Sequence, residues 1–234
     1  MSKLTTIAFD ADDTLWHNER HFKFTQNMFV ELLGNHAAPD HIHERLQAAE
    51  RKNLKFYGFG IKGFTLSMIE TAIEITGGKV EATAIAKLLE QGREMLQHPV
   101  EVLPHARETL EALHSEFKLL LITKGDLFDQ ERKVAASGLG DFFQGVEIVS
   151  DKTPEIYTQI FKRHGTGAEH GLMAGNSLKS DVIPMLKAGG YGVYVPQELT
   201  WEYEKEVLQN GHARFHEIQN LNVLTKLVED LTSL

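Results

Sequence analysis

Cysteine is absent from this sequence, and its absence excludes several classes of function. With none among 234 residues, the chain has no disulfide bond, no thiolate zinc site and no thiol catalysis. Long hydrophobic runs are missing too: the longest aliphatic run, Leu119–Ile122, is far shorter than the ~20 residues that a membrane-spanning helix needs. Nor does the segment Met1–Asp10 join a basic start to an apolar stretch, as a secretory signal would. We therefore expect a soluble, cytoplasmic protein with no membrane partner.

Positive charge is also scarce. Lys and Arg total 24 against 33 Asp and Glu, which gives a net charge of −9 with histidine neutral. Nucleic-acid binding needs clustered Lys and Arg, so this balance argues against a nucleic-acid partner. It remains compatible with a small phosphate ester held in one local positive pocket. The composition is that of a globular protein, and the length suits one core domain with a small insert.

Short apolar runs that end in polar residues predict buried strands. They are continuous rather than alternating, as in strands covered on both faces of a parallel sheet, and they lie at 7–9, 119–122, 146–149, 172–174 and 193–195. Helical signals separate them: an amphipathic stretch after Pro104, the pair Thr153-Pro154, and a start at Ser180 before Gly189-Gly190. The alternation predicts an α/β fold with a Rossmann-like, doubly wound parallel sheet.

The strand pattern disappears between Trp16 and about Leu103. Apolar residues at helical spacing there predict four amphipathic helices, near 22–33, 42–49, 66–73 and 85–96. We interpret residues 16–100 as an all-helical cap inserted after the first strand, with residues 1–15 and 101–234 forming the α/β catalytic core. The alternative, in which these helices simply cover the sheet, would require an unusually long crossover.

Polar residues follow the predicted strands, at the edge where doubly wound sheets bind ligands. Asp10 and Asp12 come directly after the first strand, and two such carboxylates can act as nucleophile and as acid or base. Thr123 and the amide of Lys124 can hold a phosphoryl oxygen. Taken alone, these clusters also suit a polar turn and an ordinary helix cap.

Two later clusters add charge and oxygen ligands. Lys152 can supply the cation that a phosphate needs, although most lysines lie on the surface. Asn176 and Asp181 offer oxygens of the kind that Mg²⁺ prefers, although Asp181 would also suit a helix N-terminus.

The four clusters together, in this order, resemble the motifs of the haloacid dehalogenase superfamily in its phosphatase branch. An apolar strand ends in Asp-x-Asp-x-Thr at Ile7–Thr14, a second strand ends in Thr123, a lysine follows at Lys152, and a Gly-led acidic segment spans Gly175–Asp181. The helical insert is similar to that family's first type of cap, the C1 type.

The resemblance implies a Mg²⁺-dependent hydrolase of a small phosphorylated metabolite. Asp10 would attack phosphorus and form an aspartyl-phosphate, and Asp12 would protonate the leaving oxygen and then activate water. Thr123, Lys124 and Lys152 would hold the phosphoryl group. Mg²⁺ would bind Asp10, the Asp12 carbonyl, and Asn176 or Asp181. The family usually has Asp where this chain has Asn176, so the direct ligand among these last two stays open.

Other activities on the same fold stay open. A dehalogenase would use Asp10 to attack carbon and would need no acid at position 12, so Asp12 argues against it. A phosphonatase needs a cap lysine, for which Lys52, Lys55 and Lys62 are the candidates. A phosphomutase would shield the aspartyl-phosphate from water. A non-catalytic, phosphate-binding regulatory module is favoured only by Asn176. The substrate and the oligomeric state are not indicated by the sequence.

Three further features are given no catalytic role. Two histidine pairs at helical spacing are weak zinc candidates: His17 with His21, and His212 with His216. The aromatic and glycine-rich segment 56–63 is either a substrate-facing loop or a plain turn between helices. The aromatic and acidic residues of 201–206 are interpreted as a surface helix.

Overall fold

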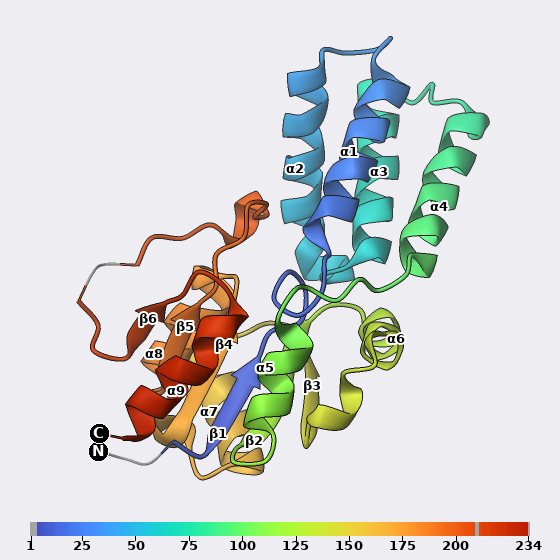
Figure 1. The fold of residues 1–234 in the computed structure, drawn as a ribbon. Helices are drawn as coiled ribbons and strands as arrows, with labels where there is room; N and C mark the ends of the chain where they lie inside the picture. Colours follow the sequence, from blue (N-terminus) through green and yellow to red (C-terminus); the bar gives the residue numbers. More distant parts are fainter. Residues whose placement is uncertain (1–3, 209–210, 234) are drawn as a thin grey trace. The chain divides into compact units, whose positions relative to one another are not determined.

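A computed structural model describes residues 4–208 and 211–233. The chain divides into two compact units, an α/β unit and a helical unit (Figure 1). The α/β unit comprises Met1–Glu19, Val100–Lys124 and Glu131–Leu234, and the helical unit comprises Arg20–Pro99 and Gly125–Gln130. The predicted function of the helical segment as a cap stays a prediction.

The α/β unit contains the sheet. Its strands, within the described residues, are β1 (Thr6–Phe9), β2 (Lys118–Lys124), β3 (Gly145–Val149), β4 (Gly171–Gly175), β5 (Tyr191–Tyr194) and β6 (Phe215–Glu217). They are ordered β3-β2-β1-β4-β5-β6, and every pairing between these named strands is parallel. The predicted Rossmann-like α/β fold is therefore confirmed. The sequence did not predict β6, because a three-residue strand is too short to give an apolar run.

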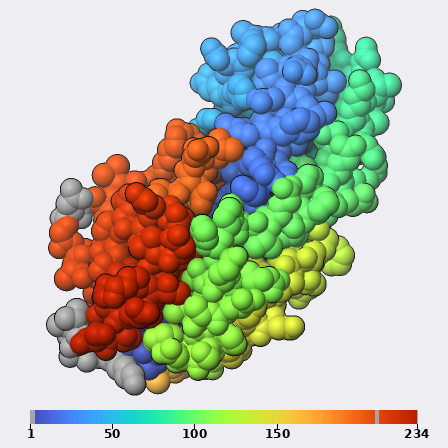
Figure 2. Space-filling model, viewed as in Figure 1, coloured from blue at the N-terminus to red at the C-terminus, as the bar shows by residue number. Residues whose placement is uncertain are grey.

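Helices cover both faces of this sheet, which explains the continuous apolar strands. Ile7 and Phe9 of β1 join the core beneath α5 (Ala106–Leu113) and α9 (Leu224–Thr232). Ala8 faces the other way, into the core beneath α7 (Pro154–His164) and α8 (Ile183–Lys187). Helices α5 and α9 lie side by side on the surface (Figure 2). The remaining longer helix, α6 (Leu127–Ser137), follows β2.

The helical unit has a core of its own. It is built by α1 (Glu19–Leu33), α2 (Pro39–Tyr57), α3 (Ile61–Ile75) and α4 (Ala82–Gln97), so the four predicted helices are present. Their apolar faces meet around Phe29, Leu46 and Met68. Helices α3 and α4 approach closely, because a Cβ at Gly92 would lie only 2.5 Å from the Thr65 hydroxyl oxygen. No helix of the described ranges is long and apolar enough to cross a membrane.

Helix starts were predicted with mixed success. The start at Thr153-Pro154 is confirmed, since the Thr153 hydroxyl accepts a hydrogen bond from the Ile156 amide at the beginning of α7. The predicted cap at Ser180 is wrong. A π-helical turn, Leu178–Val182, precedes α8, and its cap is Ser177, whose hydroxyl accepts the Ser180 amide at 3.0 Å. Ser177 and Ser180 both match the sequence pattern of an N-cap, and only the hydrogen bond that the Ser177 hydroxyl accepts from the Ser180 amide distinguishes them.

The predicted surface helix over 201–206 is also wrong. Only Glu202–Glu204 form a single 3₁₀ turn. The Trp201 and Tyr203 rings contact each other with centroids 5.0 Å apart, and the Lys179 ammonium lies over the Tyr203 ring. These contacts stabilise one turn of backbone without a longer helix.

Candidate active site

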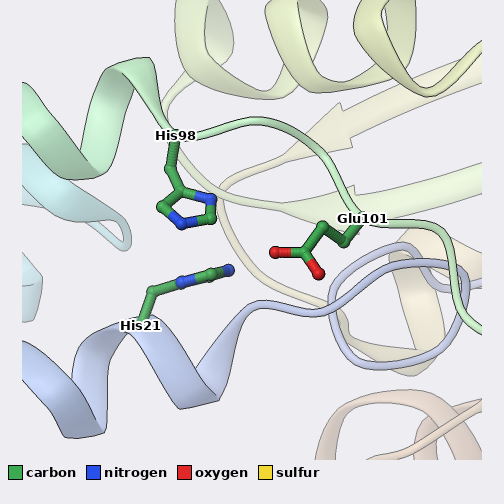
Figure 3. Close-up of side chains that lie close together, drawn as sticks. All are labelled: His21, His98 and Glu101. Carbon is green, nitrogen blue, oxygen red and sulfur yellow. The ribbon is translucent and has the colours of Figure 1, made fainter.

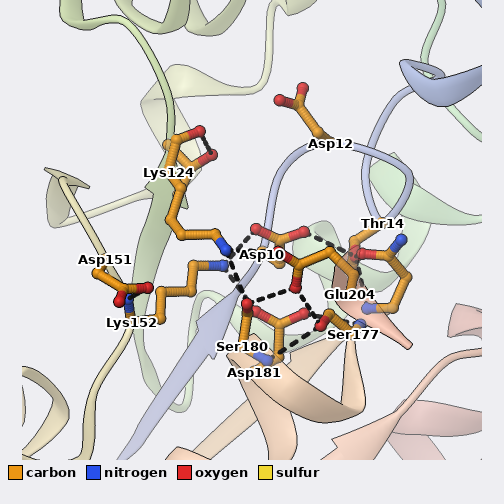
Figure 4. A network of polar contacts seen from close by, with 12 residues as sticks. Asp10, Asp12, Thr14, Lys124, Asp151, Lys152, Ser177, Ser180, Asp181 and Glu204 are labelled. Atoms are coloured by element: carbon orange, nitrogen blue, oxygen red, sulfur yellow. Dashed lines mark hydrogen bonds and ion pairs between the residues drawn. The ribbon is translucent and has the colours of Figure 1, made fainter. Parts of the chain in front are cut away.

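Three charged side chains meet at the carboxyl edge of the sheet. Asp10 follows β1, Lys152 follows β3, and Asp181 lies in the turn after β4; all three are buried. The Lys152 ammonium donates to Asp10 Oδ1 at 2.5 Å and to Asp181 Oδ1 at 2.6 Å (Figure 4). Neighbouring parallel strands end at one edge, so residues far apart in the sequence converge here. The lysine therefore bridges two buried carboxylates.

Burial dominates the electrostatics of this cluster. It raises the pKa of Asp10 from 3.8 to about 7, with the Asp181 charge adding to the rise and Lys152 opposing it. Burial alone would lower the pKa of Lys152, but the two carboxylates outweigh it and the pKa rises, so this lysine stays charged. Further positive charge beside Asp10 would favour its ionised, nucleophilic form.

Oxygen atoms gather on the other side of Asp10. In the orientation that satisfies its neighbours, the Asn176 side-chain nitrogen donates to the Asp12 carbonyl and to Asp10 Oδ2, both at 3.2 Å. With the amide turned over, the Asn176 oxygen lies beside Asp10 Oδ2 and the Asp12 carbonyl, so three oxygens are grouped. Hard divalent cations bind such oxygen sets, so these residues fit Mg²⁺.

The Asp181 carboxylate, in contrast, has donors on both oxygens. Oδ1 accepts from Lys152, and Oδ2 accepts from the Ser177 amide at 2.9 Å. A Cβ at Gly175 would overlap this carboxylate, which explains the glycine at the end of β4. Asp181 is thus held beside the lysine and by the turn that carries Asn176.

The Asp12 carboxylate points away from Asp10 (Figure 4). Lys133, on α6, donates to its two oxygens at 2.6 and 2.8 Å, and the Trp16 indole donates to Oδ1 at 2.8 Å. The next residue, Asp13, has φ +58° and accepts the Asn18 amide at 2.8 Å, so it serves as a turn residue. Sequence reasoning missed Lys133, because no local signal on α6 separates it from other lysines.

Residues at the end of β2 lie at the same carboxyl edge of the sheet. Thr123 is buried in the strand that pairs with β1. The Lys124 ammonium donates to the Ser180 hydroxyl at 2.7 Å and to Glu204 Oε1 at 2.6 Å. Glu204 lies in the segment to which the sequence assigned no role. Alternating acids at 202, 204 and 206 are typical of a solvated surface, and only tertiary contacts reveal that the Glu204 side chain is largely shielded from solvent.

The histidine pairs have other neighbours. The His21 ring lies on the His98 ring in the helical unit, with centroids 4.0 Å apart (Figure 3); Glu101, also drawn there, belongs to the α/β unit. His216 stacks on Tyr191 in the α/β unit, with centroids 6.2 Å apart. His212 Nδ1 accepts the Arg214 amide at 3.2 Å.

The segment 56–63 is held in place by contacts within the helical unit. The Lys62 ammonium donates to both oxygens of Asp126, at 2.9 and 3.0 Å. Gly60 has φ +112°, and a Cβ there would lie 3.3 Å from the Asp126 nitrogen. Phe56 and Tyr57 are exposed. A substrate-facing role for this loop stays a prediction.

Comparison with known proteins identifies the family. The family model for haloacid dehalogenase-like hydrolases matches residues 4–190. A haloacid dehalogenase-like hydrolase from Xanthomonas campestris is 40% identical, with 98% of this chain and 92% of that one covered and a TM-score of 0.87. The chain belongs to the haloacid dehalogenase-like hydrolase family. A search of curated proteins found no match.

More distant structures share the fold. HAD-hydrolase YfnB from Bacillus subtilis, bound to magnesium, is 18% identical with a TM-score of 0.65, over 97% of this chain and 99% of that one. A HAD phosphatase from Thermococcus onnurineus is 22% identical with a TM-score of 0.60, over 96% and 98%. Haloacid dehalogenases also match, at 15% and 19% identity. These likenesses show the fold and do not separate a phosphatase from a dehalogenase.

Proposed function

We propose that this hydrolase is a Mg²⁺-dependent phosphoric monoester hydrolase that forms an aspartyl-phosphate on Asp10. The observation that carries the proposal is the bridging of Asp10 and Asp181 by Lys152, next to the oxygens of Asn176 and the Asp12 carbonyl. A buried carboxylate with a fixed cation beside it suits in-line attack on an anionic phosphoryl group. The substrate would be a small phosphorylated metabolite.

Each of these residues has a separate role in the proposed reaction. Asp10 attacks phosphorus, while Lys152 stabilises the negative charge of the phosphoryl oxygens. Thr123 and the Lys124 amide hold the remaining phosphoryl oxygens at the end of β2. Asp10 Oδ2, the Asp12 carbonyl and the Asn176 oxygen would hold Mg²⁺, which when bound supplies positive charge between two anions. Asp181 keeps Lys152 and the 177–181 turn in place, since its oxygens already accept from both.

Asp12 serves as acid and then as base. It protonates the leaving oxygen in the first step and takes a proton from water in the second, since the second step reverses the proton demand of the first. Its carboxylate must first leave the hydrogen bonds from Lys133 and Trp16 and take up a proton from solvent, which the leaving oxygen then receives. Rotation of one side chain thus separates the resting site from the reactive one.

The competing activities have less support. A dehalogenase does not require the acid retained at Asp12. For a phosphonatase, two of the three candidate lysines form ion pairs in the helical unit: Lys52 pairs with Glu70, and Lys62 pairs with Asp126. A phosphomutase shares the first half-reaction and differs in excluding water. A non-catalytic module would bind beryllium fluoride, a mimic of aspartyl-phosphate, without turning over any ester.

Hydrolysis of p-nitrophenyl phosphate with Mg²⁺ and with EDTA tests the proposal. We expect turnover that requires Mg²⁺ and is abolished by EDTA. If a wider screen of sugar phosphates, nucleotides and phospho-acids with Mg²⁺ gives no turnover either, the hydrolase proposal fails. Mg²⁺-dependent binding of beryllium fluoride in that case would favour the regulatory module.

A further inference from the structure

The turn after β1 has an unusual backbone conformation at Asp13. Its φ is +58°, in the left-handed region that residues other than glycine rarely adopt. Within the described ranges, His105 is the one other residue apart from glycine with a positive φ. Aspartate tolerates this region better than most residues, because its short side chain can accept hydrogen bonds from nearby amides. Such conformations persist where the surrounding structure fixes them, and they gather at functional sites.

Hydrogen bonds hold Asp13 in this conformation. Its amide donates to the Trp16 carbonyl at 2.7 Å. One carboxylate oxygen accepts the Asn18 amide and the other accepts the Glu19 amide, both at 2.8 Å. Glu19 begins α1, so Asp13 also supplies an acceptor for an amide at the start of that helix. The residue is thus fixed by its main chain and by both oxygens of its side chain.

The φ angle of Asp13 also sets the direction of the carbonyl group before it. The planar peptide between Asp12 and Asp13 contains the Asp12 carbonyl, and it rotates with the ψ of Asp12 and the φ of Asp13. A change of φ from +58° to the helical value of about −63° would turn this plane by about 120° unless other torsions compensated. The Asp12 carbonyl is one of the three oxygens proposed to hold Mg²⁺, with Asp10 Oδ2 and the Asn176 oxygen. The left-handed conformation therefore decides whether this oxygen belongs to the group.

Closing the turn does not by itself require the Asp13 side chain. The Ala11 carbonyl accepts three amides in succession, those of Thr14, Leu15 and Trp16. Glycine at position 13 would adopt a positive φ freely, but it would also leave the peptide free to adopt other orientations. Aspartate restricts the peptide to one orientation, because its carboxylate is bound on both oxygens. The side chain thus orders the carbonyl in advance, which lowers the entropy lost when a ligand binds.

We propose that Asp13 is a positioning residue that holds the Asp12 carbonyl in place for a divalent cation before the cation binds. The inference rests on the proposed Mg²⁺-dependent function. It assigns Asp13 no contact with the substrate or with the ion. The side chain acts through the peptide that Asp13 shares with Asp12.

Calorimetric titration with Mg²⁺ tests this without any turnover, on the variants Asp13→Gly and Asp13→Ala. Both lose the carboxylate with its charge and its two acceptors, but only alanine resists a positive φ. In the free alanine variant the turn should relax, and an ion that binds must restore it. We therefore expect the Kd for Mg²⁺ to be about five- to thirtyfold higher in Asp13→Ala than in Asp13→Gly, the factor equivalent to the usual cost of a left-handed φ. The wild type should bind most tightly.

Two further comparisons separate positioning from charge and from stability. Asp13→Asn loses the same charge as the other two variants, but it tolerates a positive φ and keeps one acceptor oxygen, so we expect it to bind Mg²⁺ more tightly than Asp13→Gly. The matched control is His105, an exposed residue with φ +68° at the start of α5. His105→Gly and His105→Ala should differ in melting temperature but should both bind Mg²⁺ with the wild-type Kd. Thermal melting verifies that each variant is folded.

The outcomes are distinguishable from failure of the proposed function. A wild-type protein that binds no Mg²⁺ overturns the proposed function and this inference together. If the wild type binds Mg²⁺ and the glycine and alanine variants of Asp13 bind it equally well, the inference alone is overturned. Equal losses in all three Asp13 variants would assign the effect to charge and would overturn it too. If Asp13→Ala does not fold, the inference is overturned when Asp13→Asn and Asp13→Gly have the same Kd.

Discussion

The Lys133 ammonium donates to both oxygens of the Asp12 carboxylate, at 2.6 and 2.8 Å. The pair holds the proposed acid away from Asp10, and both side chains belong to the α/β unit. Catalysis by Asp12 must break this contact. Lys133→Met should therefore raise turnover for esters with poor leaving groups by more than about fivefold, the upper end for an exposed ion pair, because Lys133 is buried. Steady-state rates on a series of aryl and alkyl phosphates would measure it; a fall for every ester would mean that Lys133 assists the reaction instead.

Asp12→Ala gives a complementary prediction. Without an acid, departure of the leaving oxygen should slow by about 10²–10⁴-fold for alkyl esters, the usual contribution of a positioned acid. Esters whose leaving groups need no protonation should lose much less. The measurement is the dependence of kcat/KM on leaving-group pKa. An equal loss across the series would show that Asp12 does not protonate the leaving group.

The core of the site was accessible to sequence reasoning because its residues are local to strand ends. Asp10 and Asp181 follow the buried strands β1 and β4, and Lys152 follows β3, an edge strand whose predicted burial is wrong because it is only partly covered. Strand prediction and the parallel rule together still predict that the three residues converge. The alternation of strands and helices likewise predicted the sheet. The missed residues, Lys133 and Glu204, lie on a helix and on a single 3₁₀ turn without such a marker. Their partners are set by tertiary packing, which no local pattern encodes.

Position 176 offers a test of metal ligation. Asn176→Asp should bind Mg²⁺ at least as tightly as the wild type, because a carboxylate oxygen would replace the amide oxygen beside Asp10 Oδ2 and the Asp12 carbonyl. Calorimetric titration with Mg²⁺ gives the two dissociation constants. A large loss of affinity would mean that the Asn176 amide is needed as a donor to those oxygens rather than as a ligand.

A buried carboxyl in the helical unit should make stability depend on pH. Burial raises the pKa of Glu50 from 4.5 to about 7, and its Oε2 is buried with no hydrogen-bond partner within the described structure. The folded state therefore favours the protonated form, while the unfolded chain ionises near pH 4.5. The contribution of Glu50 to the free energy of unfolding is therefore fully present below pH 4.5. It is lost as the pH rises and is lowest above about pH 7.

Glu50→Gln should remove this dependence. We expect the variant to be more stable than the wild type at pH 8, by no more than about 3 kcal/mol, with the difference disappearing at pH 4. Thermal unfolding at both pH values measures it, with Glu44→Gln as the matched control on the exposed side of α2. A variant that is equally destabilised at both pH values would contradict the assignment.

The central claim is that Asp10 becomes phosphorylated. The most direct test is to incubate the protein briefly with Mg²⁺ and a phosphate ester that it hydrolyses, and then to quench the reaction in acid, which preserves acyl phosphates. The intact mass of the protein is then measured. Wild-type protein should gain the mass of one phosphoryl group, located on the peptide that contains Asp10. Asp10→Asn should gain none, while the control Asp141→Asn, at an exposed position, should behave as wild type. Phosphorylation of the Asp10→Asn protein, or of a different peptide in the wild type, would contradict the account.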